Sequence, residues 1–263
     1  MSYHNRLLQL MRTLNSIENS SFDKSKLEVI IVDDNSNDEN RLYNIPNLYK
    51  KLNFKIITLH MHSKNWTNAC IPYNIGFNYV MYDKVIIQNP ECYHMGDVLC
   101  DFYNNINDTN YISYGCYSID YNTLISNSYD KINIVNESPL YACANGWYNH
   151  SEINPKFYHF CAGITTNNLY KLSGFDEEYK DGIGFDDNEI LHRIDNLKLK
   201  KQIVNNPFVI HQWHDSVYHY TQNDNATEIE KKKFLFQKNQ MLFQNTLLNK
   251  SDYKAKNNTY YKC

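Results

Sequence analysis

A chain of 263 residues is long enough to bury one hydrophobic core, and α/β domains of this size occur as single units, so we predict one domain over 1–263. Its 26 basic and 29 acidic residues give a formal charge of -3, which excludes the basic surface of proteins that bind nucleic-acid backbones. Seven cysteines without a C-x-x-C pair fit neither a disulfide framework nor a zinc ribbon. No apolar run approaches the ~20 residues of a membrane span, and no signal peptide follows Met1, so we expect a cytoplasmic protein.

Helix and strand patterns alternate over the first third of the chain. The helices have apolar residues at helical spacing, and the strands are short, β-branched runs bounded by polar turns. In chain order we predict a helix over 5–19, a strand over 27–32, a helix over 41–51, a strand over 54–59, a helix over 71–82 and a strand over 85–87. This order favours βα units, and therefore an α/β fold with a mostly parallel central sheet flanked by helices.

The rest of the chain is less regular. Residues 119–156 have no clean period and are rich in Asn, Ser and Tyr, so we expect an irregular insertion that lines a binding cleft. Around it we predict a helix over 95–105, strands over 111–117 and 158–165, helices over 167–172 and 186–196, a strand over 207–211 and a helix over 227–248. Beyond Ser251 we expect a frayed chain.

Two polar clusters follow strands that should end at one edge of the sheet. Asp33 and Asp34 come directly after the first predicted strand, and Asn89-Pro90-Glu91 follows the third. Ligands of open α/β sheets lie beyond the carboxyl ends of the strands. Taken alone, the first cluster favours a strand-terminating turn over a carboxylate that binds a base or ribose. The second offers oxygen ligands for Mg²⁺ or Mn²⁺ against a diphosphate, although a strand stop at the proline is the stronger interpretation by itself.

A glycine-rich acidic segment opens the predicted helix over 186–196. Its sequence is Gly182-Ile183-Gly184-Phe185-Asp186-Asp187-Asn188-Glu189. Acidic residues here cap a helix and complement its dipole. Such a loop also presents one carboxylate to a cleft while another holds the loop, as a base that takes a proton from a sugar hydroxyl requires. Asp186 and Asp187 are therefore the candidate catalytic residues.

Two histidines close the last predicted strand, in His211-Gln212-Trp213-His214-Asp215. Cysteines at metal-ligand spacing are absent around them, which argues against a closed zinc site. A single imidazole that completes a Mg²⁺ or Mn²⁺ site with Glu91 is the more economical functional interpretation. A structural histidine, hydrogen-bonded at the end of a strand, explains the segment equally well.

In this order the segments resemble the GT-A glycosyltransferases of the family-2 type, and the second half resembles the galactosyl- and N-acetylgalactosaminyltransferases. The matching segments are Ser2-Tyr3-His4-Asn5-Arg6 for an S/T-Y-N-R loop, Val29-Ile30-Ile31-Val32-Asp33-Asp34-Asn35-Ser36 for V-V-D-D-x-S, Pro72-Tyr73-Asn74-Ile75-Gly76 for A-R-N-x-G, Ser173-Gly174-Phe175-Asp176-Glu177 for G-G-F-D-E, and Gly184-Phe185-Asp186-Asp187-Asn188 for G-G-E-D-x. The resemblance implies nucleotide contacts from Tyr3, Arg6, Asp34 and Asn74, with Asp34 on the base. It makes Asp187 the catalytic base, with Asp186 binding the acceptor or holding the loop.

The same resemblance implies a metal site. Glu91 matches the last, metal-binding Asp of the family's D-x-D motif, and His211 falls where these relatives supply a histidine, so Mn²⁺ or Mg²⁺ would be held by Glu91 and His211. Asn89 replaces the first Asp of the motif. That replacement leaves a less demanding ion, or catalysis without a metal, open.

The resemblance also divides the chain. It implies a nucleotide-binding half over 1–118, an acceptor-binding and catalytic half over 119–225, and a C-terminal helix and tail over 226–263. The family's first strand should precede Tyr3, and here the numbering begins at Met1. We therefore expect either a truncated start or a sheet edge completed in another way, such as by the partner chain of a homodimer.

The implied function is transfer of a hexose or N-acetylhexosamine from a UDP-sugar to a hydroxyl of a glycan, protein or small-molecule acceptor, with inversion at the anomeric carbon. Trp147, Tyr148 and Trp213 would stack on sugar faces, although large aromatic residues more often serve packing. One rival is a non-catalytic glycan- or nucleotide-binding module that kept the fold after its D-x-D motif decayed. Another is a nucleotidyltransferase, which would need a glycine- and lysine-rich phosphate loop that the N-terminal sequence lacks.

Overall fold

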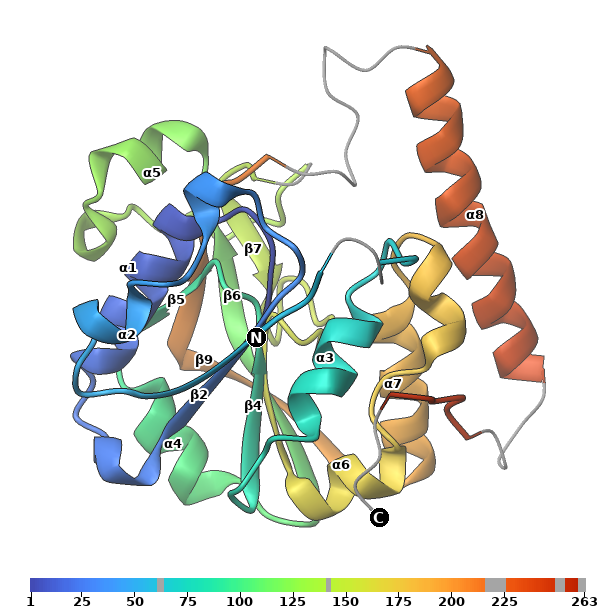
Figure 1. Ribbon diagram of the computed structural model, residues 1–263, viewed down its shortest axis with the longest axis horizontal. Helices are drawn as coiled ribbons and strands as arrows, with labels where there is room; N and C mark the ends of the chain where they lie inside the picture. The colour runs from blue at the N-terminus through green and yellow to red at the C-terminus, as the bar shows by residue number, and fades with distance from the viewer. Residues whose placement is uncertain (61–63, 141–142, 216–225, 249–253, 260–263) are drawn as a thin grey trace.

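Two β-sheets flanked by helices make up the fold in the computed structural model of the protein (Figure 1). The structure describes residues 1–60, 64–140, 143–215, 226–248 and 254–259. Helix α8 (Ala226–Leu248) lies at one side of the molecule, next to α7 (Asp186–Asn196), and the strands occupy the centre. None of the described helices is both long and apolar enough to cross a membrane.

The first sheet contains three parallel strands, β1 (Ser2–Tyr3), β2 (Glu28–Asp33) and β3 (Asn53–Thr58), in that order. Helix α1 (Leu7–Glu18) connects β1 to β2. It buries Leu10, Leu14 and Ile17, whose spacing of three and four residues puts them on one face. The alternation of strand and helix predicted for this part of the chain is confirmed.

The second sheet has six strands and is mixed. Its order is β4 (Lys84–Gln88), β8 (Cys161–Thr165), β6 (Asn110–Ser118), β9 (Lys200–His211) and β5 (Cys92–Met95), with β7 (Gly146–Asn149) paired to β6. Within it β6 and β9 pair in parallel, and the other pairs are antiparallel. The predicted α/β fold is confirmed, but parallel pairing prevails only in the first sheet. Apolar runs identify buried strands without encoding their direction.

The remaining helices differ from the predictions mainly in length. They are α2 (Ile45–Leu48), α3 (Cys70–Phe77), α4 (Val98–Asn105), α5 (Tyr121–Ser126) and α6 (Thr166–Leu172), with 3-10 turns over 24–26, 38–40, 129–131 and 177–181. The helix predicted over 41–51 shrinks to α2, which has a proline in its first turn and ends where Tyr49 leaves the helical region. The insertion over 119–156 contains α5 and β7, which are too short for a period to be recognised.

Helix α8 packs on the loop that carries the acidic segment. Asn239 is fully buried, and its Nδ2 donates to the backbone oxygens of Tyr179 at 3.0 Å and Gly184 at 2.8 Å. A Cβ added to Gly182 would lie 2.1 Å from Oδ1 of Asn239. The glycine therefore permits the close approach that fixes the loop ahead of α7.

The expectation of a frayed chain beyond Ser251 is wrong for residues 254–259. The backbone N–H groups of Asn258 and Thr259 donate to the carboxylate of Glu177 at 2.9 and 3.0 Å. Glu177 in turn accepts from Asn74 Nδ2 at 3.1 Å. These hydrogen bonds tie the described part of the tail to the loop before the acidic segment, which composition alone did not predict.

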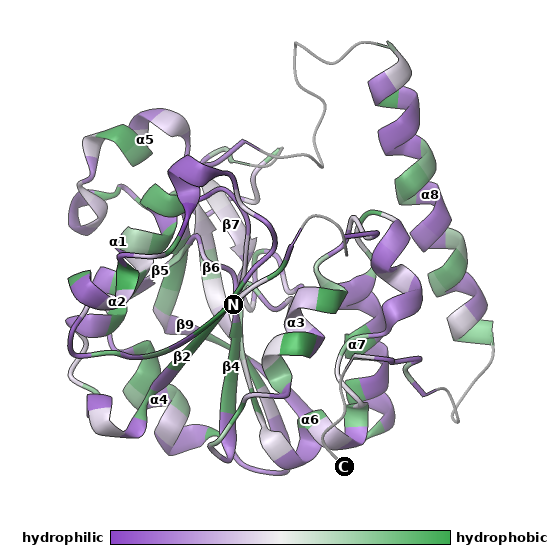
Figure 2. Ribbon diagram, in the orientation of Figure 1, coloured by the Kyte–Doolittle hydropathy of each residue, from purple (hydrophilic) through white to green (hydrophobic). Residues whose placement is uncertain are grey.

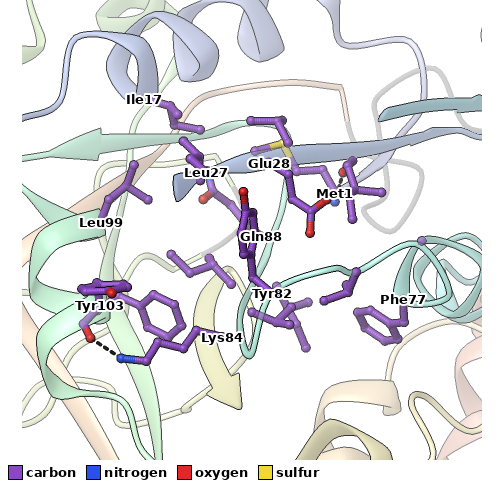
Figure 3. A pocket seen from close by; sticks show the side chains of 18 of the residues that line it. Met1, Ile17, Leu27, Glu28, Phe77, Tyr82, Lys84, Gln88, Leu99 and Tyr103 are labelled. Carbon is purple, nitrogen blue, oxygen red and sulfur yellow. Dashed lines mark hydrogen bonds between the residues drawn. The ribbon is translucent and has the colours of Figure 1, made fainter. Parts of the chain in front are cut away.

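An apolar cavity of about 350 Å³ lies between β2 and β4 (Figure 3). Both strands are strongly apolar (Figure 2). Met1 lines the cavity, and its amine donates to Ile30 O at 2.8 Å; burial lowers the pKa of this amine to about 5. Strand β1 pairs with β2 only at Val32 and Asp33. The cavity therefore lies beside the earlier part of β2, where a longer β1 would run.

Candidate active site

Segments that follow β1 and β2 meet the segment before β5 at one edge of the molecule. Arg6 follows β1, Asp34 follows β2, and Glu91 directly precedes β5. Arg6 Nη1 lies 2.8 Å from Glu91 Oε2, and His4 Nδ1 lies 2.9 Å from the backbone oxygen of Asp34. The two polar clusters singled out in the sequence are thus joined through the loop that follows β1.

Strand β5 brings Glu91 to His211. Its antiparallel register with β9 sets Cys92 opposite His211. Glu91 Oε1 lies 3.5 Å from His211 Nε2 and 3.6 Å from His214 Nε2. Gln212 fixes the backbone here, because its N–H and its Nε2 both donate to Glu91 O, at 3.1 and 3.0 Å. The structure therefore brings together the predicted pair Glu91 and His211, and it adds His214, which sequence reasoning had not assigned.

Glu91 carries its charge inside the protein, where its side chain is 1% exposed. Burial raises the pKa of this carboxyl, but the Arg6 guanidinium and hydrogen bonds from His211 and His214 outweigh burial and hold the pKa well below its usual range. Burial lowers the pKa of His211 despite the nearby carboxylate. The cluster thus combines an ionised carboxylate, a permanent cation and a neutral imidazole.

Cys143 reaches the same histidines from a distant part of the chain. Its sulfur and one ring nitrogen each of His211 and His214 lie within 4.8 Å of one another. Its thiol donates to His214 O at 3.4 Å, and its backbone N–H donates to Tyr148 Oη at 2.7 Å. The Tyr148 ring packs edge-on against His211, with 5.1 Å between centroids. Sequence reasoning missed Cys143 because it considered only cysteines near the two histidines.

A second cluster of acid and histidine surrounds Asp187 at the start of α7. Asp187 Oδ1 accepts from the backbone N–H of His159 at 2.9 Å and lies 2.5 Å from His159 Nδ1. Its side chain is 24% exposed. Asp186 takes a different partner, since its Oδ1 accepts from Asn68 Nδ2 at 2.8 Å. Phe185, with a left-handed φ of 66°, turns the chain into the helix directly before these two carboxylates.

The charges in this second cluster favour a proton on His159 or Asp186, next to Asp187. Burial and the neighbouring Asp187 carboxylate raise the pKa of Asp186. Burial lowers the pKa of His159, but the attraction of Asp187 outweighs it and raises that pKa overall. The adjacent imidazole can therefore hold a proton beside Asp187. A partly exposed carboxylate with such a partner is suited to acid–base chemistry.

Asp34 meets two residues that sequence reasoning did not assign. Lys64 Nζ donates to Asp34 Oδ2 at 2.8 Å, and Trp66 Nε1 lies 3.2 Å from Oδ1 and 3.3 Å from Oδ2. Both partners lie in the loop after β3. The sequence could have identified these partners, because a cation and an aromatic residue stand two positions apart beyond the carboxyl end of a strand.

Two residues predicted to contact the nucleotide make contacts within the protein. Tyr3 is fully buried, and its hydroxyl donates to Asn40 O at 2.7 Å. Asn74 is also fully buried and bonds the backbone of Phe175 through both side-chain atoms, at 2.9 and 2.8 Å. Both side chains hold loops of the site in place. Nucleotide binding through either of them stays a prediction.

Tyr73 lies between the two clusters. It stands on α3 at the position where the sequence motif has an arginine. Its hydroxyl donates to Asn89 Oδ1 at 2.9 Å, and its ring packs edge-on against His159 with 5.2 Å between centroids. One side chain thus contacts the segment of Glu91 on one side and the partner of Asp187 on the other.

The aromatic residues proposed to stack on sugars have packing roles in this structure. Trp147 is 5% exposed and packs edge-on against Tyr117 at 5.2 Å between centroids. Trp213 packs edge-on against Tyr121 at 4.8 Å. Tyr148 supports Cys143 and His211, as described above. Sugar stacking by these side chains stays a prediction.

Solved structures with a similar fold are glycosyltransferases. TarS 1-349 from S. aureus in complex with UDP is 16% identical, with a TM-score of 0.58 over 81% of this chain and 59% of that chain. GalNAc-T7 with UDP, GalNAc and Mn²⁺ is 16% identical, with a TM-score of 0.61 over 85% and 44%. Mannosyltransferase PcManGT from Pyrobaculum calidifontis with GDP-Man and Mn²⁺ is 14% identical, with a TM-score of 0.58 over 97% and 64%. At these identities the likeness establishes the GT-A fold, and the chain spans less than two thirds of the length of each protein.

Comparison with curated protein sequences finds no match. The model of the glycosyl transferase family 2, in contrast, matches residues 1–177. The matched part contains Arg6, Asp34, Glu91 and His159, and it covers most of the chain. The chain belongs to the glycosyl transferase family 2.

Proposed function

We propose that the protein transfers a hexose or N-acetylhexosamine from a UDP-sugar to an acceptor hydroxyl, with inversion at the anomeric carbon. The observation that carries this proposal is the position of Tyr73, which contacts Asn89 on one side and His159 on the other. A charged cluster suited to a diphosphate therefore stands next to a cluster suited to removing a proton. Transfer with inversion needs the leaving diphosphate and the base on opposite sides of the anomeric carbon.

The nucleotide would bind at the end of β2. Asp34 offers a buried carboxylate to the base, and Trp66 places an indole next to it, which suits a flat heterocycle. The structures of TarS with UDP and with UDP-GlcNAc, and of GalNAc-T7 with UDP, support a uridine nucleotide. PcManGT with GDP-Man keeps a guanosine nucleotide as the alternative.

The diphosphate would face Arg6 and the cluster around Glu91. The donor set fits a divalent ion, because Glu91 and His211 offer an ionised carboxylate and a neutral imidazole 3.5 Å apart. When bound, the ion would offset the charge of the departing diphosphate. Arg6 contributes a permanent positive charge at the same place, 2.8 Å from Glu91. This charge persists without a metal.

Asp187 would act as the base. As the acceptor oxygen bonds to the anomeric carbon and the bond from that carbon to the diphosphate oxygen breaks, the hydroxyl proton passes to the Asp187 carboxylate and UDP leaves. The backbone N–H of His159 donates to Oδ1 of Asp187, and its ring nitrogen Nδ1 lies 2.5 Å from the same oxygen. Asp186, anchored by Asn68, would hold the loop or the acceptor.

The rival function is a non-catalytic module that binds a sugar nucleotide or glycan, because Asn89 replaces an acid and Arg6 already neutralises Glu91. Calorimetric titration with UDP-, GDP- and dTDP-sugars, with and without Mn²⁺, followed by an assay of nucleotide release, separates the two. We expect UDP-sugar binding followed by UDP release in the presence of an acceptor. Binding without release on any acceptor of a broad panel would favour the module.

A further inference from the structure

Cys143, His211 and His214 together form the donor set of a thiophilic metal site, and Glu91 lies next to both histidines. We propose that this cluster binds Zn²⁺ or Co²⁺ in preference to Mg²⁺, with Cys143 as a thiolate ligand. Sulfur and imidazole are the ligands that zinc uses in proteins, whereas Mg²⁺ takes oxygen ligands. The inference rests on the proposed function only in so far as the ion would face the donor diphosphate.

The distances suit a single ion. The ligand atoms of Cys143, His211 and His214 lie within 4.8 Å of one another, and Glu91 Oε1 lies 3.5 and 3.6 Å from the two Nε2 atoms. Neighbouring donors of a tetrahedral zinc site are roughly 3.5 Å apart, because Zn–N and Zn–S bonds are about 2.0 and 2.3 Å long. The three atoms of Cys143, His211 and His214 are therefore within roughly an ångström of the spacing that one ion requires, and Glu91 lies beside the two histidines.

His211 supplies an independent indication of a missing partner. Its side chain is buried, and Nδ1 has no hydrogen-bond partner among the residues that the structure describes. Buried polar atoms normally have a partner. With Nε2 of His211 facing Glu91, the lone pair of the neutral imidazole lies on Nδ1, and a metal ion is a partner that accepts a lone pair.

Arg6 leaves room for an ion at the two histidines. It approaches Oε2 at 2.8 Å, whereas the histidines approach Oε1. The charges of a divalent ion, the Cys143 thiolate and the neighbouring Glu91 carboxylate cancel, so Arg6 becomes the net positive charge of the cluster. Arg6 and the two histidines therefore approach different oxygens of one carboxylate, and Arg6 does not compete with the ion for the histidines.

The test is a titration of the metal-free full chain with Co²⁺, followed by absorbance in the near ultraviolet, where a cobalt–thiolate bond gives a charge-transfer band. We expect one Co²⁺ per chain with this band, which is lost when Zn²⁺ is added and retained in excess Mg²⁺. Cys143→Ser should lose the band and bind Co²⁺ at least about 100-fold more weakly, exceeding the effect of an outer-shell change. Cys100→Ser, at a half-buried thiol outside the cluster, is the matched control and should keep both.

Several results would overturn the proposal: no stoichiometric Co²⁺ binding by the wild type, a band that survives in Cys143→Ser, or displacement of Co²⁺ by Mg²⁺ as readily as by Zn²⁺. Circular dichroism of each variant confirms that it is folded. If Cys143→Ser does not fold, His214→Gln takes its place, and unchanged Co²⁺ affinity in that variant would count against the site. Because the titration contains no sugar nucleotide, loss of the metal site with intact transfer refutes this inference alone, and a metal site without transfer refutes the proposed function alone.

Discussion

The two pairs of acid and histidine at this site are built for different tasks. Glu91 is 1% exposed and shares its charge with Arg6 and two imidazoles, which depress its pKa. Asp187 is 24% exposed, and the charged partner that approaches it is His159, whose own pKa is raised. Glu91 is thus a carboxylate that keeps its negative charge, whereas Asp187 is a carboxylate next to an imidazole that can gain or lose a proton.

The difference shows which surroundings decide the role of a carboxylate. A guanidinium stays protonated at any working pH, so Arg6 fixes Glu91 as an anion that can hold a cation. An imidazole, unlike a guanidinium, can lose its proton in the working pH range. His159 therefore allows the protonation state around Asp187 to change with pH. We therefore expect substitutions in the first cluster to alter binding and stability, and substitutions in the second to alter turnover.

The largest expected effect tests the second cluster. Asp187→Asn keeps the shape of the side chain but removes the base, so transfer should fall by roughly 10³-fold while UDP affinity stays within about twofold. UDP release and UDP calorimetry on the same preparation measure the two effects. Asp186→Asn is the neighbouring control, with a smaller loss of turnover. Unchanged turnover in Asp187→Asn would remove it from the role of base.

Glu91→Gln tests the first cluster. Removal of the carboxylate charge breaks the 2.8 Å ion pair with Arg6. We expect the free energy of unfolding to fall by about 2 kcal/mol. This figure is below the usual cost of breaking a buried pair because Arg6 is 24% exposed. Denaturant unfolding measures the change, and metal and donor binding should weaken in parallel. Stability equal to that of the wild type would show that the pair does not hold these loops together.

His159 offers a smaller and more selective test. His159→Ala removes the ring that approaches Asp187 Oδ1 and should lower turnover about tenfold, whereas His159→Asn replaces Nδ1 with an amide donor and should retain most of it. The rate as a function of pH should lose, in both variants, the step that titration of His159 contributes. If the alanine and asparagine variants are equally slow with an unchanged pH profile, His159 serves packing alone.

The smallest expected effect is on the pH dependence of stability. The pKa of His159 is raised in the folded protein, so the stabilisation it contributes is present below the unfolded-state pKa of about 6.5 and is lost as pH rises through the folded-state value. The melting temperature of the wild type should therefore fall across neutral pH more than that of His159→Asn. Parallel melting curves across that range would contradict the assigned direction.

The sequence predicted the parts of this site that depend on local pattern. Helix α7 has the bounds predicted, because Ile190, Leu191 and Ile194 mark one face and a glycine-rich turn marks its start. Glu91 and His211, which were paired as metal ligands, lie 3.5 Å apart, and their binding of a metal stays a prediction. Both inferences used signals that lie within a few residues of the side chain concerned.

The parts that sequence reasoning missed depend on long-range pairing. Strand β5 is only Cys92–Met95, too short for a period, yet its register with β9 is what places Glu91 beside His214. Cys143 lies in a segment without a local pattern, and the fold alone brings it to the histidines. Likewise, no local pattern around His159 predicts its contact with Asp187, which arises only when β8 and α7 pack together.

The central claim, transfer from a nucleotide sugar, is tested most directly by incubating the wild-type chain with each candidate donor and a panel of hydroxyl acceptors and determining the product by NMR. The account predicts a new glycosidic bond formed from a UDP-sugar, with an anomeric configuration opposite to that of the donor, and no product from Asp187→Asn. A product of retained configuration would contradict the role of Asp187 as base. Absence of any product despite tight donor binding would contradict glycosyl transfer itself.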